Sequence, residues 1–137
     1  MVKQGRSPRL LALNTVQNHT GIALVEDGAY SALFEEEQVG RRSTYLLAAL
    51  HDLLNKKGVT LESLDGIAVC TGPGTFTGIR VGMAVARGLA YAASLPLVGV
   101  TAFDAYAHQW SPPGTLVLAL DARRGEVYTQ VRRKPGD

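Results

Sequence analysis

The chain has 137 residues, 46% of them hydrophobic, which suits one domain with a core of its own and excludes a disordered chain. The formal net charge of +2 is too weak and too dispersed to indicate direct nucleic-acid binding, and the lone Cys70 excludes an internal disulfide. Because the sequence contains neither a signal-peptide pattern nor an apolar run of about 18 residues, we expect a cytoplasmic protein that does not enter a membrane.

Short apolar stretches at the start of the chain predict three antiparallel strands. The first two are residues 10–13 and 21–25, and a polar turn separates them. Asp27 and Gly28 then give a strong hairpin signal, so residues 29–35 are expected to continue as the third strand.

Residues 43–57 carry apolar side chains at helical spacing and predict an amphipathic helix. Ser43 or Thr44 is suited to cap its start, and Gly58 marks its end. The apolar stripe consists of Leu46, Leu47, Leu50, Leu53 and Leu54. After a short turn, the apolar run at residues 66–70 predicts a buried parallel strand.

A glycine-rich turn follows this strand and opens a second helix, expected over residues 77–94. Gly72 and Gly74 permit positive φ or a close approach of the backbone. Thr75 or Thr77 is suited to accept hydrogen bonds from the N–H groups of the helix start. Those groups attract anions, which makes both glycines candidates for cofactor binding; the alternative is a tight structural turn. The turn lacks the Gly-Lys-Ser/Thr ending of a phosphate-binding loop.

The helix expected over residues 77–94 is apolar on most of its sides. Small residues recur every four positions along it, at Gly78, Gly82, Ala86, Ala90 and Ser94. A helix of this kind needs cover on most sides, from the sheet, from the helix at 43–57 or from a second protein. Arg80 and Arg87 share one side, where they either meet carboxylates across an interface or face solvent.

The remaining sequence predicts one more strand, a short helix and a hairpin. These elements are expected at residues 95–100, at residues 102–109 with Thr101 as the cap, and at residues 116–120 and 127–131. Residues 111–114 signal a linker before the hairpin. Asp121 either faces a cleft or caps the hairpin turn.

Two stretches resemble motifs of the bacterial TsaB (YeaZ) family. Residues 72–82, GPGTFTGIRVG, match its signature over eleven consecutive positions, and residues 121–128, DARRGEVY, are similar to the opening of its second lobe. The resemblance implies an α/β fold of the actin/Hsp70-like (ASKHA, ribonuclease H-like) type: a mixed sheet with helices on its faces, in the order β-β-β-α-β-α-β-α and then a hairpin. Residues 1–110 would form the first lobe, and residues 111–137 the linker and opening hairpin of an incomplete second lobe. Family members continue further, so we expect a fragment or an unusually short member.

The resemblance also implies a noncatalytic role. TsaD proteins carry a metal and transfer the threonylcarbamoyl group to adenosine 37 of tRNAs that read codons beginning with A, while TsaB binds TsaD and the ATPase TsaE joins the pair. This chain would then need no cofactor, meet tRNA only indirectly, and form a homodimer when its partner is missing. The expected interface residues are Leu46, Leu50, Leu53, Ile79, Arg80, Met83 and Arg87.

Two departures from the relatives argue against catalysis. TsaB proteins usually begin with Asp-Thr-Ser where this chain has Asn14, Thr15 and Val16. The missing carboxylate disfavours a Mg-nucleotide site, although Asn14 and Thr15 stay candidates for nucleotide contacts, together with Asp121. The metal-binding histidine pair of TsaD is replaced by Ala102 and Tyr106. The alternative function is an enzyme of the same fold, an ATPase or a glycoprotease-type peptidase, for which no Ser/His/Asp or Cys/His set is assignable.

Overall fold

A five-stranded mixed sheet forms the larger part of the computed structural model, which describes residues 5–37 and 42–135. Its strands are β1 (Arg9–Asn14), β2 (His19–Glu26), β3 (Ala29–Glu37), β4 (Gly66–Cys70) and β5 (Leu97–Val100), in the spatial order β3-β2-β1-β4-β5. The first three pair antiparallel, whereas β4 runs parallel to β1 and β5 parallel to β4. The predicted sequence of antiparallel strands followed by parallel ones is confirmed.

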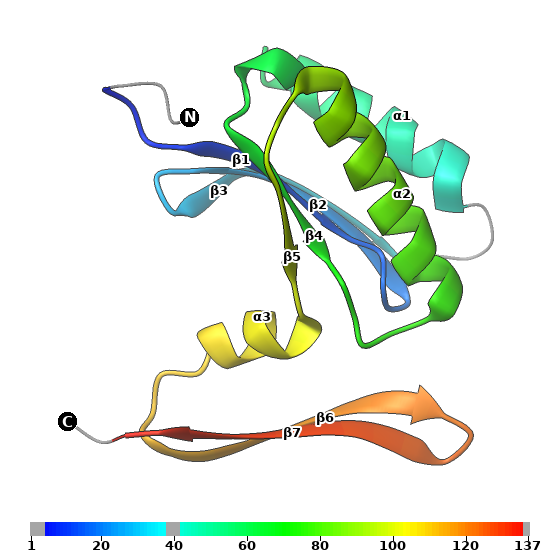
Figure 1. The fold of residues 1–137 in the computed structure, drawn as a ribbon, viewed down its shortest axis with the longest axis vertical. Coiled ribbons are helices and arrows are strands. Elements are labelled where there is room, and N and C mark those ends of the chain that lie inside the picture. The colour runs from blue at the N-terminus through cyan, green and yellow to red at the C-terminus, as the bar shows by residue number, and fades with distance from the viewer. Residues whose placement is uncertain (1–4, 38–41, 136–137) are drawn as a thin grey trace.

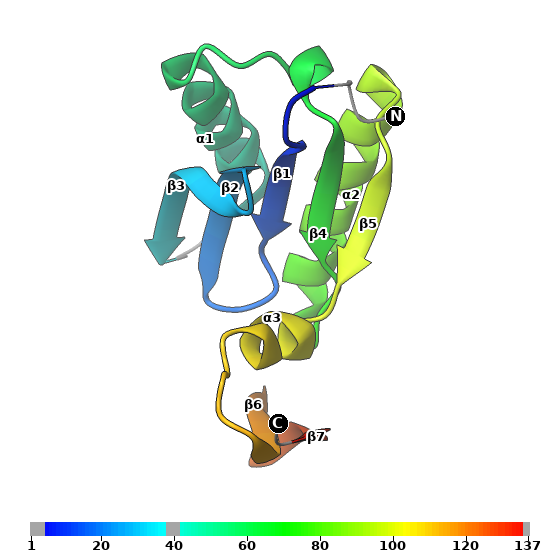
Figure 2. The same ribbon diagram turned by 90° about the vertical axis from the view of Figure 1, so that its left-hand side faces the viewer.

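The helices are α1 (Arg42–Lys56), α2 (Phe76–Ala93) and α3 (Ala102–His108), with a short 3-10 turn, η1 (Leu61–Ser63), before β4. Figures 1 and 2 show α1 and α2 side by side on one face of the sheet, with α3 beyond the carboxyl ends of β4 and β5. The structure describes α1 from Arg42, and the capping predicted for Ser43 or Thr44 concerns side chains outside the described part of the chain. None of the helices in the described ranges is long and apolar enough to cross a membrane.

The hydrophobic core lies between the sheet and these two long helices. The strands contribute alternate residues: Leu11 and Leu13 from β1, Ile22 and Leu24 from β2, and Ile67 and Val69 from β4. From α2, the predicted row of small residues is buried at Gly78, Gly82, Ala86 and Ala90. A row of small residues lets α2 lie close to the sheet, so the second face of the helix is left for other contacts.

The structure corrects the interface expected on α1. Leu46, Leu50 and Leu53 are only 0%, 5% and 8% exposed, because they pack into the core against the sheet and α2, whereas Leu47 of the predicted stripe is 49% exposed. A partner cannot touch these leucines without opening the core. Their spacing identified an apolar face correctly, but its cover comes from this chain and not from a second protein.

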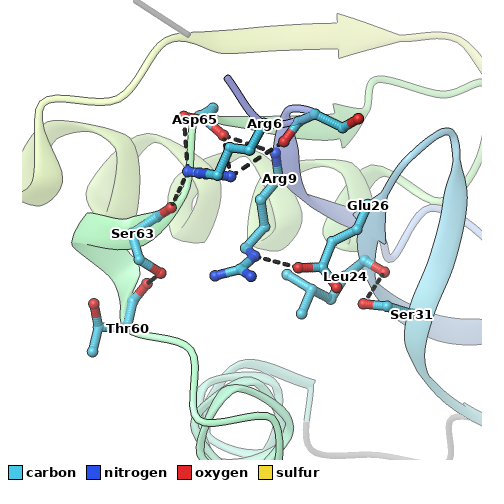
Figure 3. A network of polar contacts seen from close by, with 9 residues as sticks. Arg6, Arg9, Leu24, Glu26, Ser31, Thr60, Ser63 and Asp65 are labelled. Atoms are coloured by element: carbon cyan, nitrogen blue, oxygen red, sulfur yellow. Dashed lines mark hydrogen bonds and ion pairs between the residues drawn. The ribbon is translucent and has the colours of Figure 1, made fainter. Parts of the chain in front are cut away.

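A cluster of polar contacts holds the start of β1 against the turn before β4 (Figure 3). The buried Asp65 carboxylate accepts a hydrogen bond from the backbone N–H of Arg9 at 2.8 Å and pairs with the Arg6 guanidinium at 3.0 Å. Arg6 also donates to the carbonyl oxygen of Ser63 at 3.0 Å, and the Arg9 side chain pairs with Glu26. These contacts fix β1 beside β4 although the two strands are distant in sequence.

The chain ends in a separate two-stranded sheet of β6 (Gly114–Arg123) and β7 (Glu126–Lys134), which lies below α3 in Figure 1. Both strands are longer than the predicted apolar runs because backbone pairing continues from Gly114 with Lys134 to Arg123 with Glu126. The side of the hairpin that carries Leu116, Leu118 and Leu120 is half-buried.

Candidate functional site at the glycine turn

The glycine turn between β4 and α2 packs directly against the turn that joins β1 to β2. The backbone N–H of Thr75 donates to the carbonyl oxygen of Val16 at 2.6 Å. A Cβ atom at Gly74 would lie 1.9 Å from the same oxygen, so the backbone of the other turn excludes any side chain there. Gly72 has a φ of +104°, and its carbonyl oxygen accepts from the N–H of Ala102 at 2.7 Å. The two glycines are therefore required by backbone geometry.

The start of α2 is capped from within the chain. Thr75 is the N-cap, and its Oγ1 accepts a hydrogen bond from the backbone N–H of Gly78 at 3.1 Å. Since Thr75 also gives its own N–H to Val16, two groups that would meet an anion already have partners. This arrangement favours the structural alternative over anion binding at Gly72 and Gly74.

The other two candidates near this turn differ in exposure. Thr15 is buried, and its Oγ1 donates to the carbonyl oxygen of Gly78 at 2.6 Å, which ties the β1–β2 turn to α2. Asn14 is exposed, and its Oδ1 accepts from the backbone N–H of Val16 at 3.3 Å. Thr15 is thus committed to holding the fold together, whereas Asn14 lies at the surface.

A cleft of about 780 Å³ lies between these turns, α3 and the hairpin. Its lining includes Asn18, His19, Phe76, Tyr106, Asp121 and Tyr128. Two hydrogen bonds join its walls. Tyr106 Oη donates to Gln17 Oε1 at 3.1 Å, and Arg123 Nη2 donates to Asn18 Oδ1 at 3.1 Å.

The chemistry of this cleft suits binding by aromatic rings and hydrogen-bonding groups. Asp121 lines the cleft, but its Oδ1 accepts from the backbone N–H of Arg123 at 2.7 Å, so it also caps the hairpin turn as the alternative prediction had it. Within the part of the chain that the structure describes, no group of three or more His, Cys, Asp or Glu side chains is placed to hold a metal ion. Burial raises the pKa of the Cys70 thiol, which keeps it protonated at neutral pH.

The expected interface residues on α2 lie at or near its outer side. Arg80 and Arg87 are exposed, while Ile79 and Met83 are half-buried. Sequence reasoning missed Phe76 and Tyr91, which are 73% and 90% exposed. Helical spacing carried the signal, because Phe76 lies four residues before Arg80 and Tyr91 four residues after Arg87.

We call this exposed row the α2 stripe and define it as Phe76, Arg80, Ala84, Arg87 and Tyr91. The Arg80 guanidinium lies 5.1 Å from the centroid of the Phe76 ring, within the range of a cation–π contact. The stripe therefore has aromatic ends and two positive charges between them.

Comparisons with known proteins show sequence similarity to proteins of tRNA threonylcarbamoyladenosine biosynthesis. A family model described as TsaD: tRNA N6-adenosine threonylcarbamoyltransferase matches residues 38–134. The tRNA threonylcarbamoyladenosine biosynthesis protein TsaB of Escherichia coli (strain K12) is 37% identical over 126 residues, which cover 88% of this chain and 53% of that protein. The chain spans about half the length of the curated TsaB relatives it matches.

Solved structures agree with this grouping and confirm the predicted fold. YeaZ from Pseudomonas aeruginosa is 34% identical with a TM-score of 0.77, over 92% of this chain and 60% of that one. The ethanolamine utilization protein EutJ from Carboxydothermus hydrogenoformans, at 18% identity and a TM-score of 0.54 over 99% of this chain and 56% of that one, shares the fold alone. The predicted α/β class, with a mixed sheet and helices packed on it, is thereby confirmed. The chain belongs to the TsaD-type family and groups with its TsaB (YeaZ) members.

Proposed function

We propose that this chain is a noncatalytic accessory subunit in the biosynthesis of threonylcarbamoyladenosine on tRNA, that it binds a TsaD-type subunit, and that it enables a TsaE-type ATPase to join them. The observation that carries the proposal is the similarity to TsaB, which extends over 88% of the chain. Where TsaD has its histidine pair, Ala102 is buried at the start of α3 and Tyr106 is hydrogen-bonded to Gln17. Neither residue is suited to hold a metal.

The α2 stripe is the surface we assign to the partner. Aromatic residues and arginine are the side chains that contribute most to the stability of protein interfaces, and the stripe places them along one helix. Its two arginines call for carboxylates on the partner, flanked by apolar side chains that meet Phe76 and Tyr91. Ile79 and Met83, which are half-buried, border the stripe. The core leucines of α1 pack in the same core as the buried side of α2.

The same stripe accounts for the homodimer that we expect when the partner is missing. Phe76 and Tyr91 leave large apolar surfaces in water, and such surfaces promote association. Two copies can meet through α2, and a TsaD-type subunit would compete for the same helix. Addition of the partner should therefore replace the homodimer with a mixed complex.

The test is co-elution of this chain with the TsaD-type subunit of the same organism on a sizing column. Tyr91→Glu places a charge in the α2 stripe and should abolish co-elution. Tyr30→Glu is the matched control, because Tyr30 is 68% exposed but lies in β3, away from α2. Far-UV circular dichroism should show both variants folded.

Three results would count against the proposal. If the unaltered chain never co-elutes with the TsaD-type subunit, the accessory role falls, and ATP or peptide turnover by the chain alone would favour the enzyme alternative. If Tyr91→Glu still co-elutes, the partner uses another surface. If Tyr30→Glu also fails to co-elute with the TsaD-type subunit, the effect of Tyr91→Glu is not specific to the stripe.

A further inference from the structure

The positive charge of this chain is concentrated in its hairpin. Residues 114–135 hold five arginines and lysines and two acidic residues, a formal charge of +3, so the rest of the chain carries −1. Sequence spacing alone hid this concentration, because the runs at 123–124 and 132–134 are short and lie apart. The fold places the second run next to the end of α3, where further side chains join it.

A groove of about 360 Å³ lies between the end of α3 and the free end of the hairpin. We define the basic groove by its charged, imidazole and indole side chains: Asp104, His108, Trp110, Arg132, Arg133 and Lys134. Three cations face one carboxylate there, so with a neutral histidine the groove has a formal charge of +2. Leu116 adds an apolar contact surface.

Two of the three cations are held in place by contacts with α3 and its extension. Arg132 Nη2 lies 2.5 Å from Asp104 Oδ1, and Lys134 Nζ donates to the carbonyl oxygen of Trp110 at 3.1 Å. The exposed Arg133 side chain makes no hydrogen bond or ion pair with another described residue. It is therefore available to an external anion without the loss of an internal contact.

Trp110 gives the groove a flat aromatic surface beside these charges. Its exposed fraction is 44%, although tryptophan side chains are highly buried on average. An indole ring stacks on the face of an unpaired base whatever the base is, and neighbouring arginine and lysine side chains contact the phosphates on either side. A carboxylate-rich peptide would use the cations but would leave the indole ring without a stacking partner.

We propose that the basic groove binds a single-stranded RNA segment, with Arg133 and Lys134 at the phosphates and Trp110 stacked on a base. The choice of RNA as the polyanion rests on the proposed role in tRNA modification. The groove lies on the hairpin and the end of α3, and none of the residues that line it belongs to the α2 stripe. RNA contact and partner contact can thus occur together.

The experiment measures fluorescence anisotropy of a labelled single-stranded RNA of about 12 nucleotides, a length within the range of one such site. The chain is used alone, over a series of salt concentrations. With two or three phosphates neutralised, the slope of log K against log salt should be about −1.4 to −2. Arg133→Gln should weaken binding and reduce this slope by about 1 unit or slightly less. Trp110→Ala should weaken binding at least about fivefold with little change of slope.

The matched control is Arg124→Gln, which removes another exposed arginine, in the turn at the opposite end of the same hairpin. The RNA affinity of this variant should lie within about twofold of that of the unaltered chain, because a solvent-exposed charge further from the groove than the Debye length is largely screened. A folded state for each variant is checked by circular dichroism. Arg133→Gln removes no internal contact, so it remains informative even if Trp110→Ala unfolds the hairpin.

Three outcomes would overturn the inference: no saturable RNA binding at low salt, an equal loss for Arg124→Gln and Arg133→Gln, or displacement of the RNA by polyglutamate at equal charge concentration. The second would indicate diffuse attraction, and the third an acidic protein as the ligand. No TsaD-type subunit is present in this assay. A failure to bind RNA would therefore not refute partner binding, and a failure to co-elute with the partner would not refute RNA binding.

Discussion

Gly82 offers a direct test of how α2 is held against the sheet. A Cβ atom at this position would lie 2.3 Å from Thr15 Oγ1, far below van der Waals contact. Thr15 Oγ1 is the atom that donates to the carbonyl oxygen of Gly78 at 2.6 Å. Gly82→Ala must therefore either displace α2 or turn the Thr15 hydroxyl away from its acceptor inside the core.

The expected cost follows from three contributions of different sign. Replacement of glycine by alanine inside a helix stabilises by about 1 kcal/mol. Crowding in a packed core costs about 1–3 kcal/mol, and a buried hydroxyl without its partner costs about 1–3 kcal/mol. Gly82→Ala should thus lower the free energy of unfolding by about 1–5 kcal/mol. Gly88→Ala is the matched control in the same helix, because nothing lies within 4 Å of its added Cβ. It should raise the free energy of unfolding by about 0.5–1 kcal/mol.

A double-mutant cycle isolates the contact. In a Thr15→Ala background the obstructing oxygen is gone, and the nearest remaining atom of residue 15, its Cβ, is an ordinary 3.6 Å away. Gly82→Ala should then be neutral or stabilising by up to about 1 kcal/mol, so its effect changes sign.

The assay is urea unfolding followed by far-UV circular dichroism on the four proteins of the cycle and on Gly88→Ala. Slopes with urea should stay constant, so that midpoints report stability. If Gly82→Ala stabilises as much as Gly88→Ala, or if its cost persists in the Thr15→Ala background, the packing argument for the small-residue row is refuted.

Three further predictions concern single contacts. Gly74→Ala should cost about 2–4 kcal/mol of unfolding free energy, because its Cβ meets a backbone oxygen that cannot rotate away; an unchanged urea midpoint would contradict this. Asp65→Ala should cost about 1–3 kcal/mol in the same assay, since it leaves the backbone N–H of Arg9 without its acceptor and removes the ion pair with Arg6, and an unchanged midpoint would refute the role of the cluster. Hydrogen bonds from Thr101 and then Arg132 lower the pKa of Asp104 to about 2. Its stabilising effect is therefore present above pH 3.8 and lost as the pH falls toward 2. Arg132→Gln should raise that pKa in an NMR titration of the carboxyl carbon, and an unchanged value would exclude the ion pair.

The features that the sequence predicts correctly depend on residues close together in the chain. Asp27 and Gly28 adopt φ values of 55° and 75°, as a two-residue hairpin turn requires. Thr101 forms the predicted cap, with its Oγ1 accepting from the N–H of Asp104 at 3.0 Å. The buried strand at residues 66–70 is found with the predicted bounds. Turn chemistry, capping and short apolar runs act within a few residues, so one sequence is enough to read them.

The features that the sequence does not predict depend on contacts between distant segments. The need for glycine at position 74 comes from the Val16 carbonyl oxygen, a contact between two turns that sequence alone does not show. The stripe of Leu46, Leu50 and Leu53 predicts an apolar face but not which surface covers it. The basic groove needs the register of β7 against β6 to bring Lys134 beside Trp110. In each case the missing information is a tertiary contact between segments that lie far apart in the chain.

The glycine signature and the α2 stripe are linked by the geometry of one helix. With small residues at Gly78, Gly82 and Ala86 turned toward the sheet at a spacing of four, residues on the opposite side of α2 must face outward. Phe76 and Tyr91 are exposed for this reason. If α2 carries the partner contact, a change that tilts the helix weakens the mixed complex even though the altered residue never touches the partner. The co-elution test applied to Gly82→Ala, at a temperature where this variant remains folded, therefore measures how strictly the partner depends on the seating of α2.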